Sequence, residues 1–478
     1  MPERPNVVLI VADQMRRDAL GTNGGPHVHT PHLDQLAAEG VNFTRAYSAC
    51  PSCIAARATL LTGLRHERHG FTGYDHAPEW KYGATLAGAF AAAGYHTQCV
   101  GKMHAQPPRA LVGFHNVVLH DGFLHDRRRE YPNPDFYDDY LPWLRERLGP
   151  DADICDPGVG CNGYAARVWP WDEALHPTAF VTTKSVEFLR RRDPAKPFFL
   201  KVSYHRPHTP LDPPRSFWEM YEGVGLPEPP AGAWADGLSW NYTQVENPIP
   251  AGSHFRDRAR RAYLALVTHI DYELNRLVMA LNDLELFEDT VILFTSDHGD
   301  MLFDHGFVRK CVPFEGSAGI PLVMRLPRAL CEGRRGVTDT RLVELRDIFP
   351  TLCDACGVGI PGNLDGHSLL RDIPRGHIHG EHAYGPMSNQ WLTDGHEKYC
   401  WLSQTGRELL FDLDRDPQEL HDLSAAQPAR ATHWRNPLIR ELANRPEGYS
   451  DGTNLVAGRQ ARSALPWAGT DECPISNF

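Results

Sequence analysis

The sequence predicts an α/β protein in which helices flank a mostly parallel central sheet, followed by a small C-terminal α+β subdomain with an antiparallel sheet. Over the first three hundred residues, short apolar runs alternate with helix-like segments, which is typical of a parallel sheet covered by helices. After about residue 374 the pattern changes to short strand-like pieces separated by turn residues. The length of 478 residues also exceeds the size of one hydrophobic core, which stops growing at roughly 250 to 300 residues.

The elements of the first part follow one another as strand, loop and helix. Residues 7–12 are an apolar run that predicts a buried strand. Thr30 and Pro31 precede the helical pattern of 32–39, and Gly40 follows it, which supplies a cap, a first-turn proline and a C-terminal stop. Similar patterns predict helices over 85–93, 178–192 and 256–286, and strands over 96–100, 197–204 and 290–296.

Two later regions complete the predicted organisation. Residues 109–177 have no steady periodicity, so we expect loops and short helices that cover the main domain and determine specificity. The antiparallel sheet is predicted from strands at 377–382, 398–402 and 409–412. We therefore divide the chain into a large α/β domain (1–375), a C-terminal antiparallel subdomain (376–446) and an extended tail (447–478).

The tail is apolar in places, yet it lacks the periodicity from which an independent core could form. Trp467 and Phe478 are its expected anchors, because aromatic side chains bury large areas. They can pack onto the same chain or across a subunit boundary. The second arrangement predicts a homo-oligomer, either a dimer or a tetramer.

Composition and charge exclude several classes of protein. Hydrophobic residues make up 42% and charged residues 23% of the chain, as in ordinary globular proteins. The net charge of −12 repels a phosphate backbone, so a nucleic-acid binder is not expected. No stretch approaches the roughly 18 apolar residues that cross a membrane. The 11 cysteines are too sparse for a disulfide scaffold, which favours a reducing, cytoplasmic location.

Polar residues follow four of the predicted strands. They are Asp13-Gln14, the run Gly101-Lys102-Met103-His104, the run His205-Arg206-Pro207-His208, and the run Asp297-His298-Gly299-Asp300. In parallel α/β sheets, ligands bind beyond the carboxyl ends of the strands. The oxygens of Asp13, Gln14 and Asp297 favour a hard cation, to which His298 can add a nitrogen ligand.

The segment from Ser48 to Gly63 resembles the sulfatase signature, in which a cysteine precedes an arginine by four residues and a Leu-Thr-Gly segment follows. Only one register fits, because Ile54 lies four residues after Cys50 and Arg57 lies four residues after Cys53. The resemblance extends to the four strand ends, to Lys310 before Pro313-Phe314-Glu315-Gly316, and to Leu409-Leu410-Phe411-Asp412-Leu413-Asp414. It implies an alkaline-phosphatase-like fold and a hydrolase of sulfate monoesters.

The resemblance also implies a role for each residue of the site. Cys53 would be converted by a maturation enzyme to formylglycine, whose hydrated aldehyde is the nucleophile. Asp13, Gln14, Asp297 and His298 would hold one divalent cation, with Ca²⁺ as first choice and Mn²⁺ or Mg²⁺ as alternatives. Arg57, Lys102 and Lys310 would bind the anionic group, His208 would protonate the leaving alcohol, and His104 would act as base. His205 would line the pocket.

Two departures from the pattern leave alternatives open. Ala55 stands where many sulfatases have Pro, and Gln14 stands where many have a second Asp. The Gln and Asp-His combination also resembles choline sulfatases and phosphonate monoester hydrolases of the same superfamily. A phosphonate or phosphodiester hydrolase is therefore the second hypothesis, and an inactive binding protein with unconverted Cys53 is the third.

A four-cysteine zinc site is a further interpretation, which pairs Cys50 and Cys53 with Cys353 and Cys356. Zinc motifs place such pairs roughly 12 to 20 residues apart, far closer than these. We expect Cys353 and Cys356 to be small buried residues on a helix.

Overall fold

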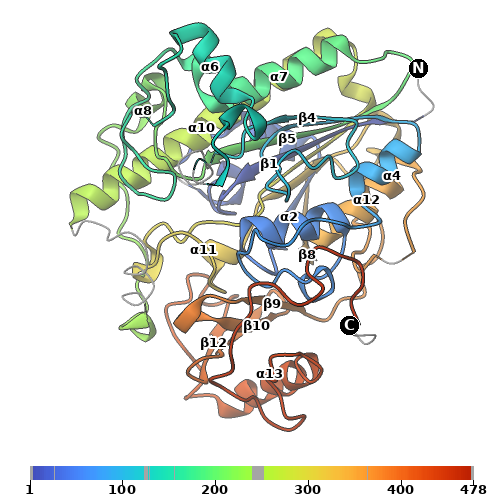
Figure 1. Cartoon of the computed structure of the whole chain (residues 1–478). Helices are drawn as coiled ribbons and strands as arrows, with labels where there is room; N and C mark the ends of the chain where they lie inside the picture. Colours follow the sequence, from blue (N-terminus) through green and yellow to red (C-terminus); the bar gives the residue numbers. More distant parts are fainter. Residues whose placement is uncertain are drawn as a thin grey trace.

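The computed structural model describes residues 4–25, 27–122, 128, 130–155, 157–238, 252–362 and 364–474. Its main part is an eight-stranded sheet with the order β4-β3-β5-β1-β6-β7-β2-β8, and a separate four-stranded sheet lies near the C-terminal end of the chain (Figure 1). This arrangement confirms the predicted fold class.

The centre of the large sheet is parallel. It consists of β3 (His96–Gly101), β5 (Phe198–Pro207), β1 (Asn6–Asp13) and β6 (Thr290–Thr295), with β4 (Asn116–Leu119) parallel at one edge. On the other side, β7 (Leu322–Arg325) is antiparallel to both β6 and β2 (Val41–Tyr47), and β2 pairs in parallel with β8 (Val337–Glu344). The strands that the sequence places before polar residues are thus neighbours.

Alternate residues of β1 explain why helices cover both faces of this sheet. Val7 and Leu9 pack into an apolar cluster with α2 (Cys53–Thr62), α4 (Leu86–Ala92) and α12 (Ile348–Cys356). Val8 and Ile10 point the other way and pack with α1 (Pro31–Ala38), α7 (Pro177–Arg191) and α10 (Ser253–Asp283). Figure 1 shows α7 and α10 on one side and α2, α4 and α12 on the other. The continuous apolar run of residues 7–12 follows from burial on both faces.

The smaller sheet is antiparallel throughout. It comprises β9 (Ile378–His382), β10 (Asn389–Thr393), β11 (Glu397–Leu402) and β12 (Arg407–Asp412). Helix α13 (Pro428–Glu441) covers one face, with Trp434 and Leu438 packed against Leu392 and Trp401. Three of these strands match the sequence prediction, and β10 adds a fourth.

Several short elements are not apparent from the sequence. They are β2, β4, β7, β8, β10, α3 (His66–His69), α6 (Tyr140–Leu148), α8 (Arg215–Tyr221) and α11 (Glu315–Ala318). All of them have only four to nine residues, which is too short for a period to be recognised. The domain boundaries at 375/376 and 446/447 stay predictions. Among the described residues, no helix combines the length and apolar character that crossing a membrane requires.

The described part of the tail, residues 447–474, packs onto its own chain. Tyr449, Leu465 and Trp467 are buried. The Leu465 N–H donates to Gly70 O at 2.8 Å, and Trp467 Nε1 donates to Glu67 O at 2.8 Å. Of the two arrangements left open above, Trp467 therefore adopts the one within the chain, whereas Phe478 lies outside the described residues. The homo-oligomer stays a prediction.

Candidate active site

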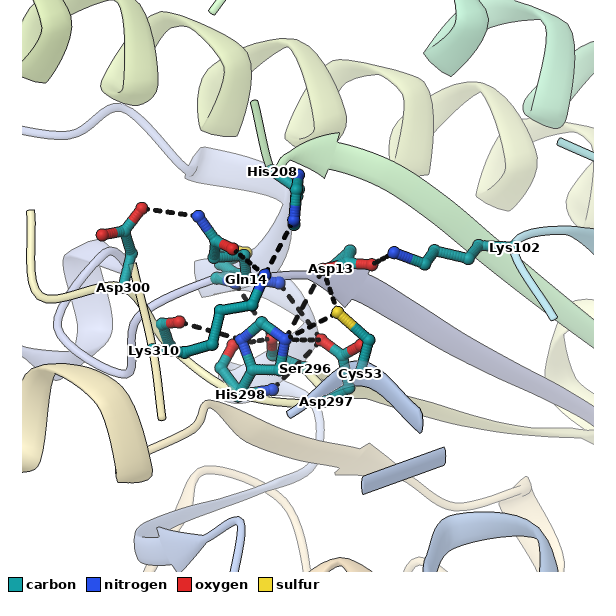
Figure 2. A network of polar contacts seen from close by, with 12 residues as sticks. Asp13, Gln14, Cys53, Lys102, His208, Ser296, Asp297, His298, Asp300 and Lys310 are labelled. Atoms are coloured by element: carbon teal, nitrogen blue, oxygen red, sulfur yellow. Dashed lines mark hydrogen bonds and ion pairs between the residues drawn. The ribbon is translucent and has the colours of Figure 1, made fainter. Parts of the chain in front are cut away.

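Most of the predicted site residues meet at the carboxyl edge of the four central parallel strands (Figure 2). Asp13 ends β1, Lys102 and His104 follow β3, and His208 follows β5. Asp297 and His298 lie just beyond β6. Lys310 reaches the same place from the loop before α11.

Cys53 is the first residue of α2, and its side chain lies inside this group. Its Sγ is 3.1 Å from His298 Nε2 and 3.8 Å from Asp13 Oδ1. Burial opposes ionisation of the thiol, but the positive charges of Lys102 and Lys310 outweigh it, so the pKa of Cys53 lies below its ordinary value. The helix N-terminus also favours negative charge at this position. The surroundings of residue 53 therefore favour a negative charge at its side chain.

Oxygen and nitrogen ligands surround Cys53. Ligand atoms of Asp13, Cys53, Asp297 and His298 all lie within 4.8 Å of one another, and all four residues are buried. Burial opposes ionisation of Asp13, but the adjacent Lys102 outweighs it, and the pKa of this carboxyl lies well below its ordinary value. Two carboxylates and an imidazole in a closed space fit a divalent cation.

Gln14 adds an oriented amide to this cluster. Its backbone has a φ of 65°, and its N–H donates to Asp297 Oδ1 at 3.1 Å. The side-chain Nε2 donates to Asp300 Oδ2 at 2.7 Å, and Oε1 accepts from Lys310 Nζ at 2.7 Å. Because a carboxylate can only accept, Asp300 fixes the amide with its oxygen on the side of Lys310.

Arg57 contacts the carboxylates of both Asp13 and Asp297. Its Nε donates to Asp297 Oδ2 at 3.0 Å and its Nη2 donates to Asp13 Oδ2 at 3.2 Å. Nη1 donates to the Lys102 carbonyl and to Ser203 Oγ, each at 2.9 Å. These contacts hold the two carboxylates in place. A contact between Arg57 and the anionic group stays a prediction.

The side chains of Lys310 and His208 are in direct contact. His208 Nδ1 lies 2.9 Å from Thr209 O, and its Nε2 lies 2.8 Å from Lys310 Nζ. A carbonyl only accepts, so Nδ1 carries the hydrogen and Nε2 accepts from the ammonium. Burial first, and the charge of Lys310 second, hold the pKa of His208 well below its ordinary value. The sequence predicted an acid poised near neutrality, whereas the proton here resides on Lys310.

The turn after β3 places Lys102 and His104. Gly101 has a φ of 96°, and a Cβ there would lie 2.0 Å from Ser203 O, so only glycine fits. Lys102 Nζ pairs with Asp13 Oδ2. The His104 N–H donates to Asp121 Oδ1 at 3.1 Å, and the His104 ring lies 5.8 Å from that of Tyr74.

His205 lies next to His208. Its ring centroid lies 5.0 Å from that of His208, and its Nδ1 accepts from Arg206 Nη1 at 2.6 Å. Burial and Arg206 hold the pKa of His205 well below its ordinary value. The pocket-lining role expected from the sequence stays a prediction.

The predicted site is almost closed to solvent. The ten predicted site residues are all buried, and Lys310, at 9% exposure, is the most accessible of them.

Two residues near the site, Tyr164 and Lys201, are missed by the sequence reasoning, and Asp300 is named there without a role. Asp300 accepts from Tyr164 Oη at 2.6 Å, and Lys201 Nζ donates to Lys102 O at 2.9 Å. Burial lowers the pKa of Lys201 to about 8. A lone lysine in the apolar run of β5 was an available signal, whereas Tyr164 lies in the irregular segment 109–177, where no pattern marks it.

The four-cysteine interpretation finds no support. Cys353 and Cys356 are buried on α12 in the apolar cluster on one face of the large sheet, as expected. Among the described residues, neither belongs to a group of potential metal ligands.

Comparison with known proteins agrees with this geometry. The sulfatase family model matches residues 5–358. An arylsulfatase of Clostridium perfringens is 45% identical over 95% of this chain and 98% of its own, and a choline-sulfatase of Rhizobium meliloti is 29% identical over 96% and 86%. The crystal structure of a phosphonate monoester hydrolase of Agrobacterium radiobacter superposes with a TM-score of 0.74, at 26% identity, over 92% of this chain and 96% of that one. The match over most of the chain, with Cys53 at the centre of the site, shows that the chain belongs to the sulfatase family.

Proposed function

We propose that the protein hydrolyses an organic sulfate monoester of the aryl, carbohydrate or choline type, with residue 53 as nucleophile after conversion of Cys53 to formylglycine. Sulfuric ester hydrolysis as the reaction class follows from the family and from the 45% identity to an arylsulfatase. The position of Cys53 carries the finer proposal. It begins α2 inside a buried group of carboxylates, imidazoles and ammonium groups.

The cofactor in this proposal is one divalent cation, with Ca²⁺ first and Mn²⁺ or Mg²⁺ as alternatives. Asp13, Gln14, Asp297 and His298 would hold it, and its charge would lower the pKa of the attacking hydroxyl and neutralise sulfate oxygens. Arg57 keeps Asp13 and Asp297 in position through its hydrogen bonds. The partner that maturation requires is an enzyme that converts Cys53 to formylglycine.

The first half of the reaction breaks the bond between sulfur and the alcohol oxygen. Lys102 and Lys310 hold the anionic group, and one hydroxyl of the hydrated aldehyde attacks sulfur. The departing oxygen takes a proton from His208 Nε2. In the resting contact Nε2 accepts from Lys310 Nζ, so Lys310 is the source of that proton.

The second half releases sulfate and restores the aldehyde. His104 takes the proton of the remaining hydroxyl, and its oxygen forms the carbonyl as the bond between carbon and the sulfate oxygen breaks. Water then hydrates the aldehyde for the next cycle. The proton released by the attacking hydroxyl replaces the one that Lys310 gave up, and the proton on His104 passes to solvent. The net reaction consumes one water and yields the alcohol, inorganic sulfate and one proton.

A phosphonate monoester or phosphodiester hydrolase on the same scaffold is the second candidate. Gln14 and the likeness to a phosphonate monoester hydrolase favour it, whereas Lys102, His104 and Lys310 favour sulfate. A screen of aryl, sugar and choline sulfates against phosphate and phosphonate esters separates the two. A kcat/KM that is highest for a phosphonate or a phosphodiester would contradict the sulfatase assignment.

His208→Ala is expected to slow sulfate esters of poor leaving groups more than those of good ones. An activated phenolate departs without protonation, whereas an alkoxide requires a proton. General acids contribute about 10² to 10⁴-fold, so alkyl-type sulfates should lose activity over this range. The measurement is kcat/KM against leaving-group pKa for both enzymes. Equal losses across the series would remove His208 from this role.

Asp300→Asn is expected to weaken cation binding about 10- to 100-fold, because it disturbs an outer partner of a ligand. The new amide places a donor against Gln14 Nε2, and the Gln14 amide must turn its oxygen away from the cluster. In the double variant Asp300→Asn with Gln14→Glu, the amide of residue 300 donates to the carboxylate of residue 14. This variant should recover the affinity for the cation. Titration of the cation-free chains by calorimetry measures the effect. An unchanged Kd in Asp300→Asn would show that the Gln14 oxygen is not a ligand.

A further inference from the structure

Lys201 is a buried cation that the proposed reaction does not use. It lies within β5 and is fully buried. Its neighbours in register are Leu9 of β1 and Cys99 of β3, and Phe199 precedes it by two residues on the same strand. All three neighbours belong to the apolar cluster on the side of the sheet that α2 covers. Lys201 thus places a charge on an apolar face of the sheet.

The ammonium of Lys201 has few partners. Lys201 Nζ donates to Lys102 O at 2.9 Å, and its other contact is Cys99 Sγ at 3.9 Å. Among the described residues, no carboxylate forms an ion pair with it. Burial of such a charge opposes folding, and it lowers the pKa of Lys201 to about 8. Buried groups of this kind are found more often at functional sites, where their cost to stability serves another purpose.

The oxygen that Lys201 contacts belongs to the main chain of a proposed substrate-binding residue. Lys102 O accepts from Lys201 Nζ and from Arg57 Nη1, each at 2.9 Å. The Lys102 N–H donates to Ser203 O at 2.8 Å. Both main-chain polar groups of Lys102 are therefore fixed, and its side chain extends to Asp13, with which Nζ pairs (Figure 2).

The rest of this turn has a separate anchor. Asp121 Oδ1 accepts from the N–H of Met103 at 2.9 Å and from the N–H of His104 at 3.1 Å. Loss of the contact from Lys201 should therefore act on Lys102 and leave the proposed base His104 in place.

We propose that Lys201 is a positioning residue of the active site, which holds the main chain of Lys102 so that its ammonium meets Asp13 and the anionic group of the substrate. It acts together with Arg57 at the same carbonyl and does not itself touch the substrate. This inference rests on the proposed function in one respect, the assignment of Lys102 to the anionic group.

The test is Lys201→Met in the full chain, because methionine has a similar length and no N–H. For the ester with the highest kcat/KM in the screen described above, we expect kcat/KM to fall about 10- to 100-fold, the usual cost of losing an outer partner. The Ki of inorganic sulfate should rise over the same range. Tm should not fall, because a costly buried charge is removed and Lys102 O keeps its contact with Arg57.

The Ki of sulfate separates positioning from a purely structural role. Ki does not depend on the fraction of chains that are active, so a partly misfolded preparation cannot imitate its rise. An unchanged Ki or an unchanged kcat/KM in Lys201→Met would overturn the proposal. A lower Tm with an unchanged Ki is the result expected of a purely structural lysine, and it would overturn the proposal equally.

Cys99→Ala is the matched control. It removes the other contact of Lys201 Nζ and a buried side chain on the same face of the sheet. Because the contact with Lys102 O is retained, kcat/KM and the Ki of sulfate should stay close to those of the parent chain.

A double-mutant cycle with Lys102→Met shows whether Lys201 acts through Lys102. In the Lys102→Met background, Lys201→Met should add little further loss of kcat/KM. A loss as large as in the parent chain would overturn the proposal. A parent chain that prefers a phosphonate or a phosphodiester would contradict the sulfatase assignment instead, and the cycle measured with that ester would still decide the role of Lys201.

Discussion

Cys53→Ala is expected to lower kcat by about 10⁶-fold, the loss that follows removal of a covalent nucleophile in a hydrolase. The fold should persist, because the substitution removes one buried sulfur and costs about 1 kcal/mol of unfolding free energy. Turnover of an aryl sulfate and thermal unfolding of the purified variant measure the two effects.

Cys50→Ala is the matched control for this prediction. Cys50 is also buried, and it packs with Ile54, Ala55 and Phe71 rather than in the polar cluster. Its loss should leave kcat close to that of the parent chain. Multiple turnover by pure Cys53→Ala protein would contradict the assignment of the nucleophile.

Removal of the divalent cation is expected to reduce kcat/KM on the order of 10³-fold. Stabilisation of charge by a metal is worth several kcal/mol, and each 1.36 kcal/mol is a factor of ten in rate. Asp297→Asn should have a similar effect, because it removes a carboxylate that Gln14 and Arg57 contact. Activity and elemental composition are measured before and after dialysis against a chelator, and after the cation is restored.

Asp271→Asn provides the control for Asp297→Asn. Asp271 is a buried carboxylate that accepts from the backbone N–H groups of His32 and Leu33 and lies outside the cluster. Its substitution should not change metal content. Full activity of a chain shown to be metal-free would remove the cation from the mechanism.

The sequence predicts the framework of the site well because parallel strands impose it. Residues that follow β1, β3, β5 and β6 must meet at one edge, whatever the loops do. The same logic cannot find partners that arrive from irregular segments. Tyr164, which donates to Asp300, lies in such a segment and has no periodic signal.

The protonation state of His208 shows a second limit of the sequence. A histidine after a strand indicates acid and base chemistry, but its pKa depends on burial and on Lys310, which lies about a hundred residues away in the chain. The packing partner of Trp467 likewise cannot be predicted from the sequence. Its aromatic side chain predicts burial, and only the three-dimensional structure shows that Glu67 of the same chain receives its N–H.

The mass of the peptide containing residue 53, measured alongside kcat on the same preparations, tests the central claim most directly. Preparations made with and without a formylglycine-generating enzyme will differ in the fraction of chains that carry the aldehyde. The account predicts that kcat per chain rises in proportion to this fraction and falls to the Cys53→Ala level when every chain keeps its thiol. A preparation with an intact thiol at residue 53 throughout, yet with undiminished sulfatase activity, would contradict it.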